Sequence, residues 1–482
     1  MSSQVIAVDL DGTLANTDTL HEQIALLLFS NVKKIPGAIT ALFKGKAAFK
    51  SYNAKEILLK VESLNYQTDL IEFLQHSKEQ GAYIVLCTAA DSRVADAVSK
   101  YHQGLFDEVI GTKDNVNLKG KTKAALLKER FPEGFIYAGD SSADLAVWEE
   151  SDEIILVGAS KNVTKKAKAL GKSLNKPIAG EYEHKIKHAK SRFRIWTKAL
   201  RVKHWAKNVL MFIPLILSHS FLDVNIISQT LLGFLLLLAI TSSTYLINDL
   251  ADLDADRKHP TKRFRPIASG AVAISDALII ALITIPIALV LAFLLKPAFA
   301  FALFGYLVIT LSYSFGLKKI PMLDTFIIGT LFTSRIVMGG LLLGVALSDW
   351  LLVFSMFFFF SLAVAKRQVE ILQMKSSIEK ASSGRGYIYS DAELLLVFGV
   401  SSSVASLLIL VLYMKFEAFE IVGYARPDFL WGIVMAVAIW LGRIWLLTHR
   451  GQMNDDPVDF ALQDKTSIAL GAVVALSFLV AM

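Results

Sequence analysis

The sequence predicts an α/β doubly wound domain with a small helical cap, followed by an all-α polytopic membrane domain of about nine transmembrane helices. The chain has 482 residues, of which 54% are hydrophobic, and its two parts differ in how these residues are distributed. Residues 1–160 mix charged and apolar side chains, as soluble domains do. From 201 to 482, apolar runs recur that approach the roughly 20 residues needed by a membrane-crossing helix.

A basic stretch, 161–200, lies between these two parts. Attraction to the anionic headgroups of a cytoplasmic leaflet explains it better than binding to nucleic acid does, so we expect a linker or membrane-surface helix and no nucleic-acid partner. The first residues lack the charged segment and apolar run of a signal peptide, which predicts a cytoplasmic N-terminal domain. Cys87 is the only cysteine, which excludes intramolecular disulfides and cysteine-rich metal sites.

The N-terminal domain alternates strand-like apolar runs with helical segments. The runs lie at 5–10, 83–88, 135–138 and 154–157. This alternation is typical of βαβ units, which form a parallel, doubly wound sheet. Residues 15–66 interrupt the alternation with helical sequence, and we interpret them as a helical cap over the ends of the strands.

Polar residues follow the predicted strands. Asp9 and Asp11 alternate at the end of the first strand, so both point towards the edge where open α/β sheets bind ligands. Gly12 permits a sharp turn and a close approach to phosphate. Two carboxylates here suit a nucleophile and a general acid/base, with oxygen left for a divalent cation. Further candidates are Thr88 after the second strand, Lys123 at a helix start, and Asp140 and Asp144 after the third strand.

In this order, these residues resemble the haloacid dehalogenase (HAD) superfamily over residues 1–160. The resemblance implies a Mg²⁺-dependent phosphatase in which Asp9 is the nucleophile that forms an aspartyl-phosphate and Asp11 is the general acid/base. It implies phosphoryl contacts by Thr88 and Lys123 and metal binding by Asp9, Asp11, Asp140 and Asp144. Lys119 and Lys121 lie so close to Lys123 in sequence that the identity of the lysine stays open.

The membrane domain is predicted from nine apolar segments. They lie at 205–221, 228–248, 274–295, 298–314, 322–345, 349–366, 392–413, 428–447 and 466–482. Basic residues concentrate after the second, fourth and sixth segments: Arg257, Lys258, Lys262, Arg263, Arg265, Lys318, Lys319, Lys366, Arg367, Lys375, Lys380 and Arg385. The positive-inside rule places these loops in the cytoplasm. We therefore expect a multi-pass protein of a bacterial inner membrane, with both active sites cytoplasmic.

The second predicted membrane helix ends in an acidic cluster. Asn248, Asp252 and Asp256 are successive i,i+4 neighbours, and Asp249 lies three residues before Asp252, so these four share a helix face. Asp254 lies about 200° around the helix from Asp252 and is the expected bystander. Such oxygen ligands suit Mg²⁺, which usually binds substrate phosphates as well. We expect catalysis through this metal, with the departing charge of a diphosphate neutralised by Arg257, Lys262, Arg263 and Arg265.

The pattern NDxxDxxxD resembles the UbiA prenyltransferase superfamily over residues 192–482. Members usually carry a second aspartate-rich motif, which binds another metal and the prenyl diphosphate. Here the corresponding end of the sixth helix has Lys366, Arg367 and Glu370. This departure favours binding of an additional anion, and the alternative interpretation is an interfacial Lys366–Glu370 ion pair. The loop 450–457 has no chemistry that we can assign beyond a gate or a charge contact.

Segments 202–208, 259–266 and 312–318 resemble a narrower branch, the decaprenyl-phosphate phosphoribosyltransferases. This resemblance implies transfer of 5-phosphoribose from phosphoribosyl diphosphate to a polyprenyl phosphate, with Lys207, Asn208, Tyr313 and Lys318 near the lipid phosphate or the sugar. The HAD domain would then remove the 5-phosphate of the product. Two alternatives stay open: an aromatic or quinone-type prenyltransferase with an unrelated phosphatase activity, and a catalytically silent membrane scaffold.

Overall fold

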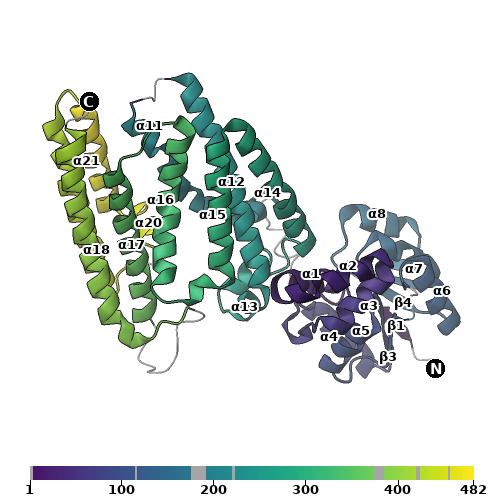
Figure 1. Ribbon diagram of the computed structural model, residues 1–482. Helices are drawn as coiled ribbons and strands as arrows, with labels where there is room; N and C mark the ends of the chain where they lie inside the picture. The colour runs from purple at the N-terminus through teal and green to yellow at the C-terminus, as the bar shows by residue number, and fades with distance from the viewer. Residues whose placement is uncertain are drawn as a thin grey trace. The chain divides into compact units, whose positions relative to one another are not determined.

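The computed structural model of the chain describes residues 4–113, 117–174, 192–219, 223–373, 385–419, 424–453 and 456–482 (Figure 1). It divides into two compact units. The first comprises 1–200 and 245–281, and the second comprises 201–244 and 282–482. Helices α12 (Val224–Ala251) and α14 (Ile274–Leu295) therefore contribute residues to both. Residues 175–191, most of the predicted basic linker, lie outside the described residues, as do Lys375 and Lys380 of the basic loops.

A parallel sheet of six strands, in the order β3-β2-β1-β4-β5-β6, forms the centre of the N-terminal domain (Figure 1). The strands are β1 (Val5–Val8), β2 (Tyr83–Asp91), β3 (Glu108–Thr112), β4 (Ile136–Gly139), β5 (Glu153–Leu156) and β6 (Ser173–Leu174). The strand order reverses between β1 and β4, which is where doubly wound sheets bind ligands. The predicted fold is confirmed, and β6 carries the sheet beyond the predicted boundary at 160.

Alternate residues of β1 face two different cores. Ile6 and Val8 are buried in one core with side chains of α4 (Thr68–Glu79) and α5 (Ser92–Tyr101). Ala7 is buried in the other core with Cys87 and residues of α6 (Lys121–Arg130), α7 (Leu145–Glu150) and α8 (Lys161–Ala169). Helices thus cover both faces of the sheet, as the period-two alternation of strand side chains requires.

The predicted cap is present between β1 and α4. It consists of α1 (Thr19–Ser30), η1 (Val32–Lys34), α2 (Ile35–Phe43), α3 (Lys46–Glu56) and η2 (Val61–Ser63). The Asp18 carboxylate starts α1 by accepting hydrogen bonds from the amides of Leu20 and His21. Leu27, Ala38 and Ile57 form a small core inside the cap.

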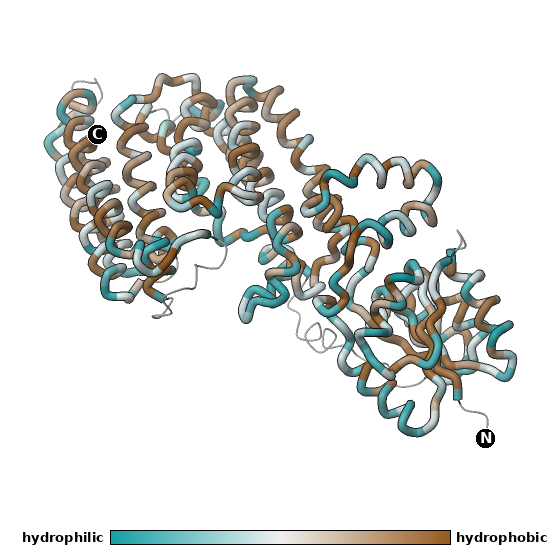
Figure 2. The backbone as a smooth tube through the Cα atoms, turned by 60° about the horizontal axis from the view of Figure 1, so that its bottom comes forward, coloured by the Kyte–Doolittle hydropathy of each residue, from teal (hydrophilic) through white to brown (hydrophobic). Residues whose placement is uncertain are grey.

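Seven helices in the described part of the chain are long and apolar enough to cross a membrane (Figure 2). They are α12, α14, α15 (Pro297–Phe315), α16 (Leu323–Leu343), α17 (Asp349–Leu372), Tyr389–Ala418, which contains α18 (Ala392–Tyr413), and Pro427–His449, which contains α19 (Trp431–His449). Only 17% of the most apolar stretch of α14 is buried within the protein. Such an exposed apolar surface is stable only against lipid, which confirms the polytopic membrane domain.

The first and last predicted membrane helices differ from the expectation. Segment 205–221 contains the 3₁₀ helix η4 (Val202–Phe212) and the short α11 (Ile213–Leu217). Here Pro214 starts a new helix, and polar side chains such as the buried Asn208 interrupt the apolar run. The last segment forms α21 (Lys465–Ala481), which at 17 residues is shorter than the other spans. The remaining elements are η3 (Ser142–Asp144), α10 (Arg192–Ala199), α13 (Leu253–Lys258), η5 (Lys262–Phe264), η6 (Leu317–Lys319), η7 (Tyr389–Asp391), η8 (Met414–Ala418), η9 (Pro427–Leu430) and α20 (Pro457–Ala461).

Candidate active sites

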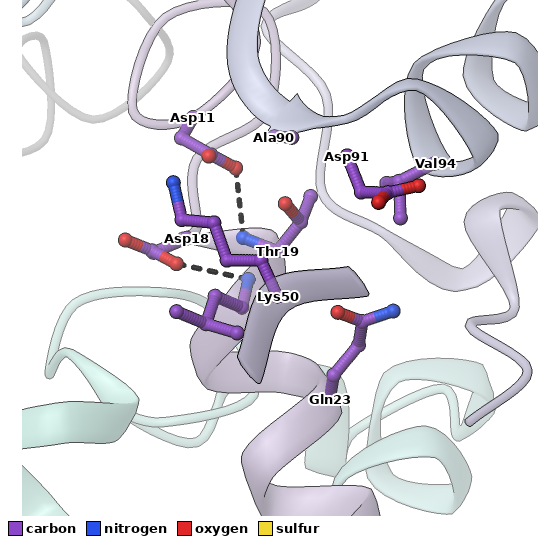
Figure 3. A pocket seen from close by; sticks show the side chains of 9 residues that line it. Asp11, Asp18, Thr19, Gln23, Lys50, Ala90, Asp91 and Val94 are labelled. Atoms are coloured by element: carbon purple, nitrogen blue, oxygen red, sulfur yellow. Dashed lines mark hydrogen bonds between the residues drawn. The ribbon is translucent and has the colours of Figure 1, made fainter. Parts of the chain in front are cut away.

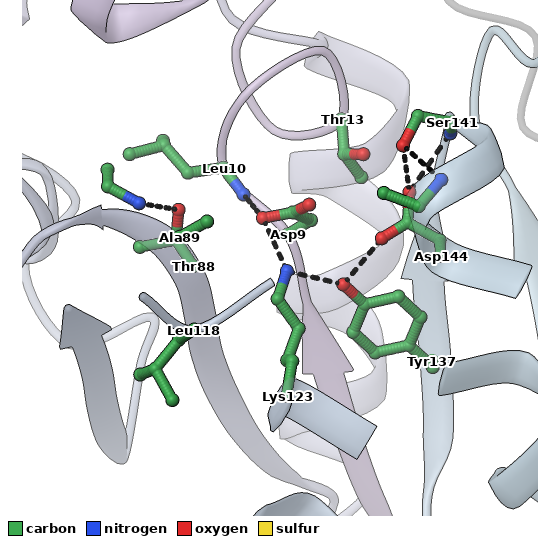
Figure 4. Close-up of polar contacts among 12 residues, drawn as sticks. Asp9, Leu10, Thr13, Thr88, Ala89, Leu118, Lys123, Tyr137, Ser141 and Asp144 are labelled. Atoms are coloured by element: carbon green, nitrogen blue, oxygen red, sulfur yellow. Dashed lines mark hydrogen bonds and ion pairs between the residues drawn. The ribbon is translucent and has the colours of Figure 1, made fainter. Parts of the chain in front are cut away.

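The carboxyl ends of β1 and β4 bring the predicted phosphatase residues together (Figure 4). The ammonium of Lys123 lies 3.0 Å from Oδ1 of Asp9 and donates a hydrogen bond of 2.8 Å to the hydroxyl of Tyr137. Lys123 is buried, whereas Lys119 and Lys121 are exposed. Of the three candidate lysines, Lys123 is therefore the one in contact with Asp9.

Gly12 allows the loop after β1 to pack directly on Asp140. Its φ of +77° is in the left-handed region, and a Cβ atom there would lie 2.5 Å from the Asp140 carboxylate. The Thr13 hydroxyl donates to the same carboxylate at 3.2 Å. Asp11 accepts a hydrogen bond of 2.8 Å from the amide of Thr19, at the start of α1. Any side chain at position 12 would separate the two acidic loops.

Asp144, predicted at the metal site beside Asp140, is held by hydrogen bonds within the domain. It is buried, and its two oxygens accept hydrogen bonds from the Tyr137 hydroxyl (3.0 Å), the amides of Asp140 (3.3 Å) and Ser141 (2.9 Å), and the Ser141 hydroxyl (2.8 Å). These donors occupy the carboxylate, so Asp144 positions the loop that carries Asp140. Thr88 is also buried, and its hydroxyl accepts from the amide of Ala90 at 3.0 Å.

The phosphatase carboxylates outnumber the cations beside them. Burial, with Asp18 nearby, raises the pKa of Asp11 to about 7. Burial, with Asp144 and Asp9 nearby, raises the pKa of Asp140 to about 7. Burial also raises the pKa of Asp9, although Lys123 opposes this. Oxygen donors carrying uncompensated negative charge fit a hard divalent cation, although the described residues contain no arrangement of three or more Asp, Glu, His or Cys that already forms a metal cage.

Lys50 of the cap is a site residue that the sequence analysis missed. It lines a pocket with Asp11, Asp18 and Gln23, and its ammonium points towards the two aspartates (Figure 3). It donates a hydrogen bond of 2.8 Å to the carbonyl of Ala89, and burial lowers its pKa. The sequence feature that could have indicated Lys50 is a run of cap residues that contains several lysines and no Asp or Glu.

The acidic motif of the membrane domain lies in the first unit. Helix α12 ends at Ala251 and α13 begins at Leu253, yet the amides of Asp252 and Asp256 still bond to carbonyls four residues earlier. The carboxylates of Asp249 and Asp256 are each 3% exposed, and the Arg265 guanidinium donates to both, at 3.3 and 2.6 Å. One arginine thus bridges two of the predicted metal ligands. The side-chain oxygens of Asn248, Asp249, Asp252 and Asp256 are of the type that fits Mg²⁺.

Arg257, predicted to bind diphosphate, has a partner within the protein. It forms an ion pair of 2.6 Å with Glu22 of α1, and the two side chains are only 4% and 3% exposed. Asp254 also contacts the cap, because its Oδ2 lies 3.6 Å from the ammonium of Lys60. The other predicted cations, Lys262 and Arg263, are exposed.

Arg367 is buried inside the second unit. Its side chain is 1% exposed and donates to Asp324 at 2.6 Å, to Glu370 at 2.7 and 2.8 Å, and to the Tyr313 hydroxyl at 3.2 Å. The Tyr387 hydroxyl donates to Asp324, and Arg385 pairs with Glu370. Three residues predicted to contact substrate, Arg367, Glu370 and Tyr313, thus bond to one another in a network near the end of α17.

Lys366 points elsewhere and does not pair with Glu370. Its ammonium lies 3.2 Å from Oδ2 of Asp456, and the ammonium of Lys207 lies 2.6 Å from the same oxygen. Burial raises the pKa of Asp456, but the two lysines together lower it below its usual range. The loop 450–457 therefore supplies a charge contact, one of the two roles that we considered for it. Lys318, in η6, is half-buried.

Asn208 is a structural residue in this arrangement. It is buried, donates to the Thr241 hydroxyl at 3.3 Å and accepts from Arg335 at 2.7 Å. Arg335 of α16 also donates to the Tyr306 hydroxyl at 2.8 Å. Asn208 thus ties η4 to two membrane helices, because a buried arginine in a membrane domain needs polar partners within the protein.

Comparison with known proteins identifies both parts of the chain. The family model of the UbiA prenyltransferase family matches residues 210–463, and that of the haloacid dehalogenase-like hydrolases matches residues 6–149. The uncharacterized protein y4nM of Sinorhizobium fredii is 41% identical over 474 residues, which cover 98% of this chain and 90% of that protein. The decaprenyl-phosphate phosphoribosyltransferase of Mycobacterium tuberculosis is 29% identical over 276 residues, which cover 56% of this chain and 87% of that enzyme.

A solved structure of a UbiA homolog from Archaeoglobus fulgidus, bound to GPP and Mg²⁺, aligns with 60% of this chain and 98% of its own, at 15% identity and a TM-score of 0.45. The UbiA and HAD families generally use Mg²⁺. The chain therefore belongs to the UbiA prenyltransferase family, and it joins that membrane domain to a haloacid dehalogenase-like hydrolase domain.

Proposed function

We propose that this protein transfers 5-phosphoribose from phosphoribosyl diphosphate to a polyprenyl phosphate, and that its HAD domain then removes the 5-phosphate of the lipid-linked product. The observation that carries the transferase proposal is the pair of ammonium groups, from Lys207 and Lys366, on one oxygen of Asp456. Lysines bind phosphate as point charges. Lys366 lies near the end of α17, where the second acidic motif of a prenyl diphosphate site is expected, and Lys207 adds a second cation beside the same carboxylate oxygen. This pair of cations supports binding of an anion there without its own metal.

In the proposed transfer, an oxygen of the lipid phosphate bonds to C1 of the ribose while the bond from C1 to the diphosphate breaks, and the diphosphate leaves with the electron pair. The lipid phosphate is already an anion, so its attack needs no general base. Mg²⁺ held by Asn248, Asp249, Asp252 and Asp256 would neutralise the departing diphosphate. Arg265, whose guanidinium bridges Asp249 and Asp256 here, would contribute its positive charge to the same diphosphate when a metal occupies those carboxylates.

In the proposed phosphatase step, Asp9 attacks the 5-phosphate and forms an aspartyl-phosphate. The contacts of Asp9 with Lys123 and with the amide of Leu10 both fall on Oδ1, which leaves Oδ2 to attack. Asp11, with its raised pKa, carries a proton near neutral pH and gives it to the departing ribose oxygen. Water then hydrolyses the aspartyl-phosphate, with Asp11 as the base. Mg²⁺ at Asp9 and Asp140 would offset the charge of the phosphate.

The donor specificity can be tested directly. Purified protein with Mg²⁺, polyprenyl phosphate and labelled phosphoribosyl diphosphate should move the label into the lipid fraction. The variant Lys366→Gln should raise the KM for the polyprenyl phosphate, whereas Lys319→Gln, at an exposed lysine, serves as the matched control. If the protein instead prenylates 4-hydroxybenzoate from a prenyl diphosphate and ignores the sugar donor, the proposal is wrong.

We also propose that the protein resides in the bacterial inner membrane with its N-terminal domain and both sites in the cytoplasm. The support is the concentration of basic residues in alternate loops. A compartment-sensitive reporter inserted between Ser348 and Asp349 should report the periplasm. One inserted between Ser382 and Ser383, a position outside the described residues, should report the cytoplasm. Exchange of the two signals would contradict the topology.

A further inference from the structure

The tip of the cap presents apolar side chains to the outside. Phe43 at the end of α2 is 89% exposed, and Ile39, Leu42 and the preceding Val32 are each at least half exposed. The opposite face of α2 is buried within the cap, because Ala38 packs into the small core there. Single exposed apolar residues are common in soluble domains, but a cluster of four large ones on one short segment marks a surface that something covers.

The charge around this tip indicates what covers it. From Asn31 through Lys55 the sequence contains six lysines and no Asp or Glu. Lys33 precedes α2, Lys44 and Lys46 follow it, and all three are exposed. Apolar side chains flanked by lysines are typical of a helix in the interface of a bilayer with anionic lipids, where the ammonium groups meet headgroups and the apolar face enters the acyl boundary.

The geometry of the cap excludes a membrane crossing and fits an interfacial position. Helix α1 and the segment Val32–Phe43 together have the length and composition of a membrane span, but the chain bends by 109° between them. Helix α2 alone has nine residues, a length of roughly 13 Å, which is less than half of the roughly 30 Å of a hydrocarbon core. It can therefore lie along a bilayer surface but cannot span one.

Helix α1, which leads into this tip, is attached to a membrane helix inside the first unit. Ala25 of α1 is buried in one core with Leu246 and Leu250 of α12, and Glu22 pairs with Arg257 just beyond α12. The cytoplasmic end of a membrane helix lies at the headgroup level. The attachment therefore places α1 beside the end of a membrane helix.

We propose that the segment Val32–Lys46, here called the cap anchor, is an interfacial membrane anchor that inserts Ile39, Leu42 and Phe43 into a bilayer containing anionic lipids. The anchor would place the pocket of Asp11 and Lys50 at the membrane surface, open to phosphates carried on lipids.

The full-length protein in lipid nanodiscs provides the test. Phe43→Cys is labelled with an environment-sensitive fluorophore, and because Cys87 is buried, the unsubstituted protein gives the labelling background. We expect blue-shifted emission and strong quenching by spin labels placed roughly 5–10 Å below the headgroups. Glu129→Cys, on an exposed turn of α6, is the matched control and should stay water-exposed and several-fold less quenched.

A second arm tests the lipid charge. Quenching of the Phe43 probe should fall when anionic lipid is omitted or when Lys44 and Lys46 are changed to Glu. If the Phe43 variant does not fold, Leu42→Cys should give the same pattern. Emission and quenching equal to those of the Glu129 probe would overturn the proposal. The emission could also be blue-shifted without quenching by the lipid spin labels, and the blue shift could disappear when each nanodisc holds one copy of the protein. This result would mean that a second copy of the chain covers α2, and it would also overturn the proposal.

Discussion

Asp252→Asn in the UbiA domain is expected to lower phosphoribosyl transfer by about 100-fold or more, the typical loss when a group that stabilises transition-state charge is removed. Asp252 lies where α12 passes into α13, and its amide keeps the helical register of the acidic motif. The substitution preserves shape and removes one negative charge from the proposed metal site. Transfer of label from phosphoribosyl diphosphate to lipid measures the effect, and phosphate release by the HAD domain from a phosphomonoester supplied to it directly should not change.

Asp254→Asn is the control for this experiment. Asp254 lies two residues further along and is also acidic, but its carboxylate pairs with Lys60 and Ser63 of the cap. Its loss should leave transfer close to that of the unsubstituted protein. Equal losses in the two variants would mean that the whole loop, and not the proposed ligand set, responds to a change of charge.

Asp9→Asn is expected to abolish the phosphatase step and to make lipid-linked phosphoribose accumulate. The amide cannot form the phosphoenzyme, and it cannot replace the carboxylate beside the buried Lys123. The unsubstituted protein should instead yield lipid-linked ribose. Mass spectrometry of the lipid fraction distinguishes the products by one phosphate group.

Asp96→Asn serves as the matched control, because Asp96 is an exposed residue of α5 away from the strand ends. It should give the product of the unsubstituted protein. If Asp9→Asn and the unsubstituted protein give the same lipid, the HAD domain acts on another phosphate ester. That result would not contradict the transferase proposal, because the label-transfer assay measures only the use of the donor and the acceptor.

The phosphatase constellation could be predicted because each member is fixed by its local position. Asp9 and Asp140 directly follow neighbouring parallel strands, and such strands bring their carboxyl ends to one edge whatever the rest of the chain does. Strands β3 and β6 were not predicted. Ser173–Leu174 is too short for a recognisable pattern, and Glu108–Thr112 contains few apolar residues.

The roles of the charged residues in the membrane domain could not be predicted in the same way, because their partners are distant in sequence. Arg257 pairs with a glutamate 235 positions away, and Arg367 pairs with an aspartate 43 positions away. An arginine in a basic loop looks the same in sequence whether it faces a diphosphate or a buried carboxylate. Only the folded chain distinguishes a cation that is available to a ligand from one already neutralised.

The Glu22–Arg257 ion pair restricts which substitutions this protein can accept during evolution. Losing one member of a buried ion pair leaves an uncompensated charge and costs about 3–5 kcal/mol, whereas an apolar pair of similar size is tolerated. Positions 22 and 257 therefore have to change together. A chimera that takes its HAD domain from another phosphatase would set Arg257 against an unmatched side chain, so the two catalytic modules of this chain are not freely exchangeable parts.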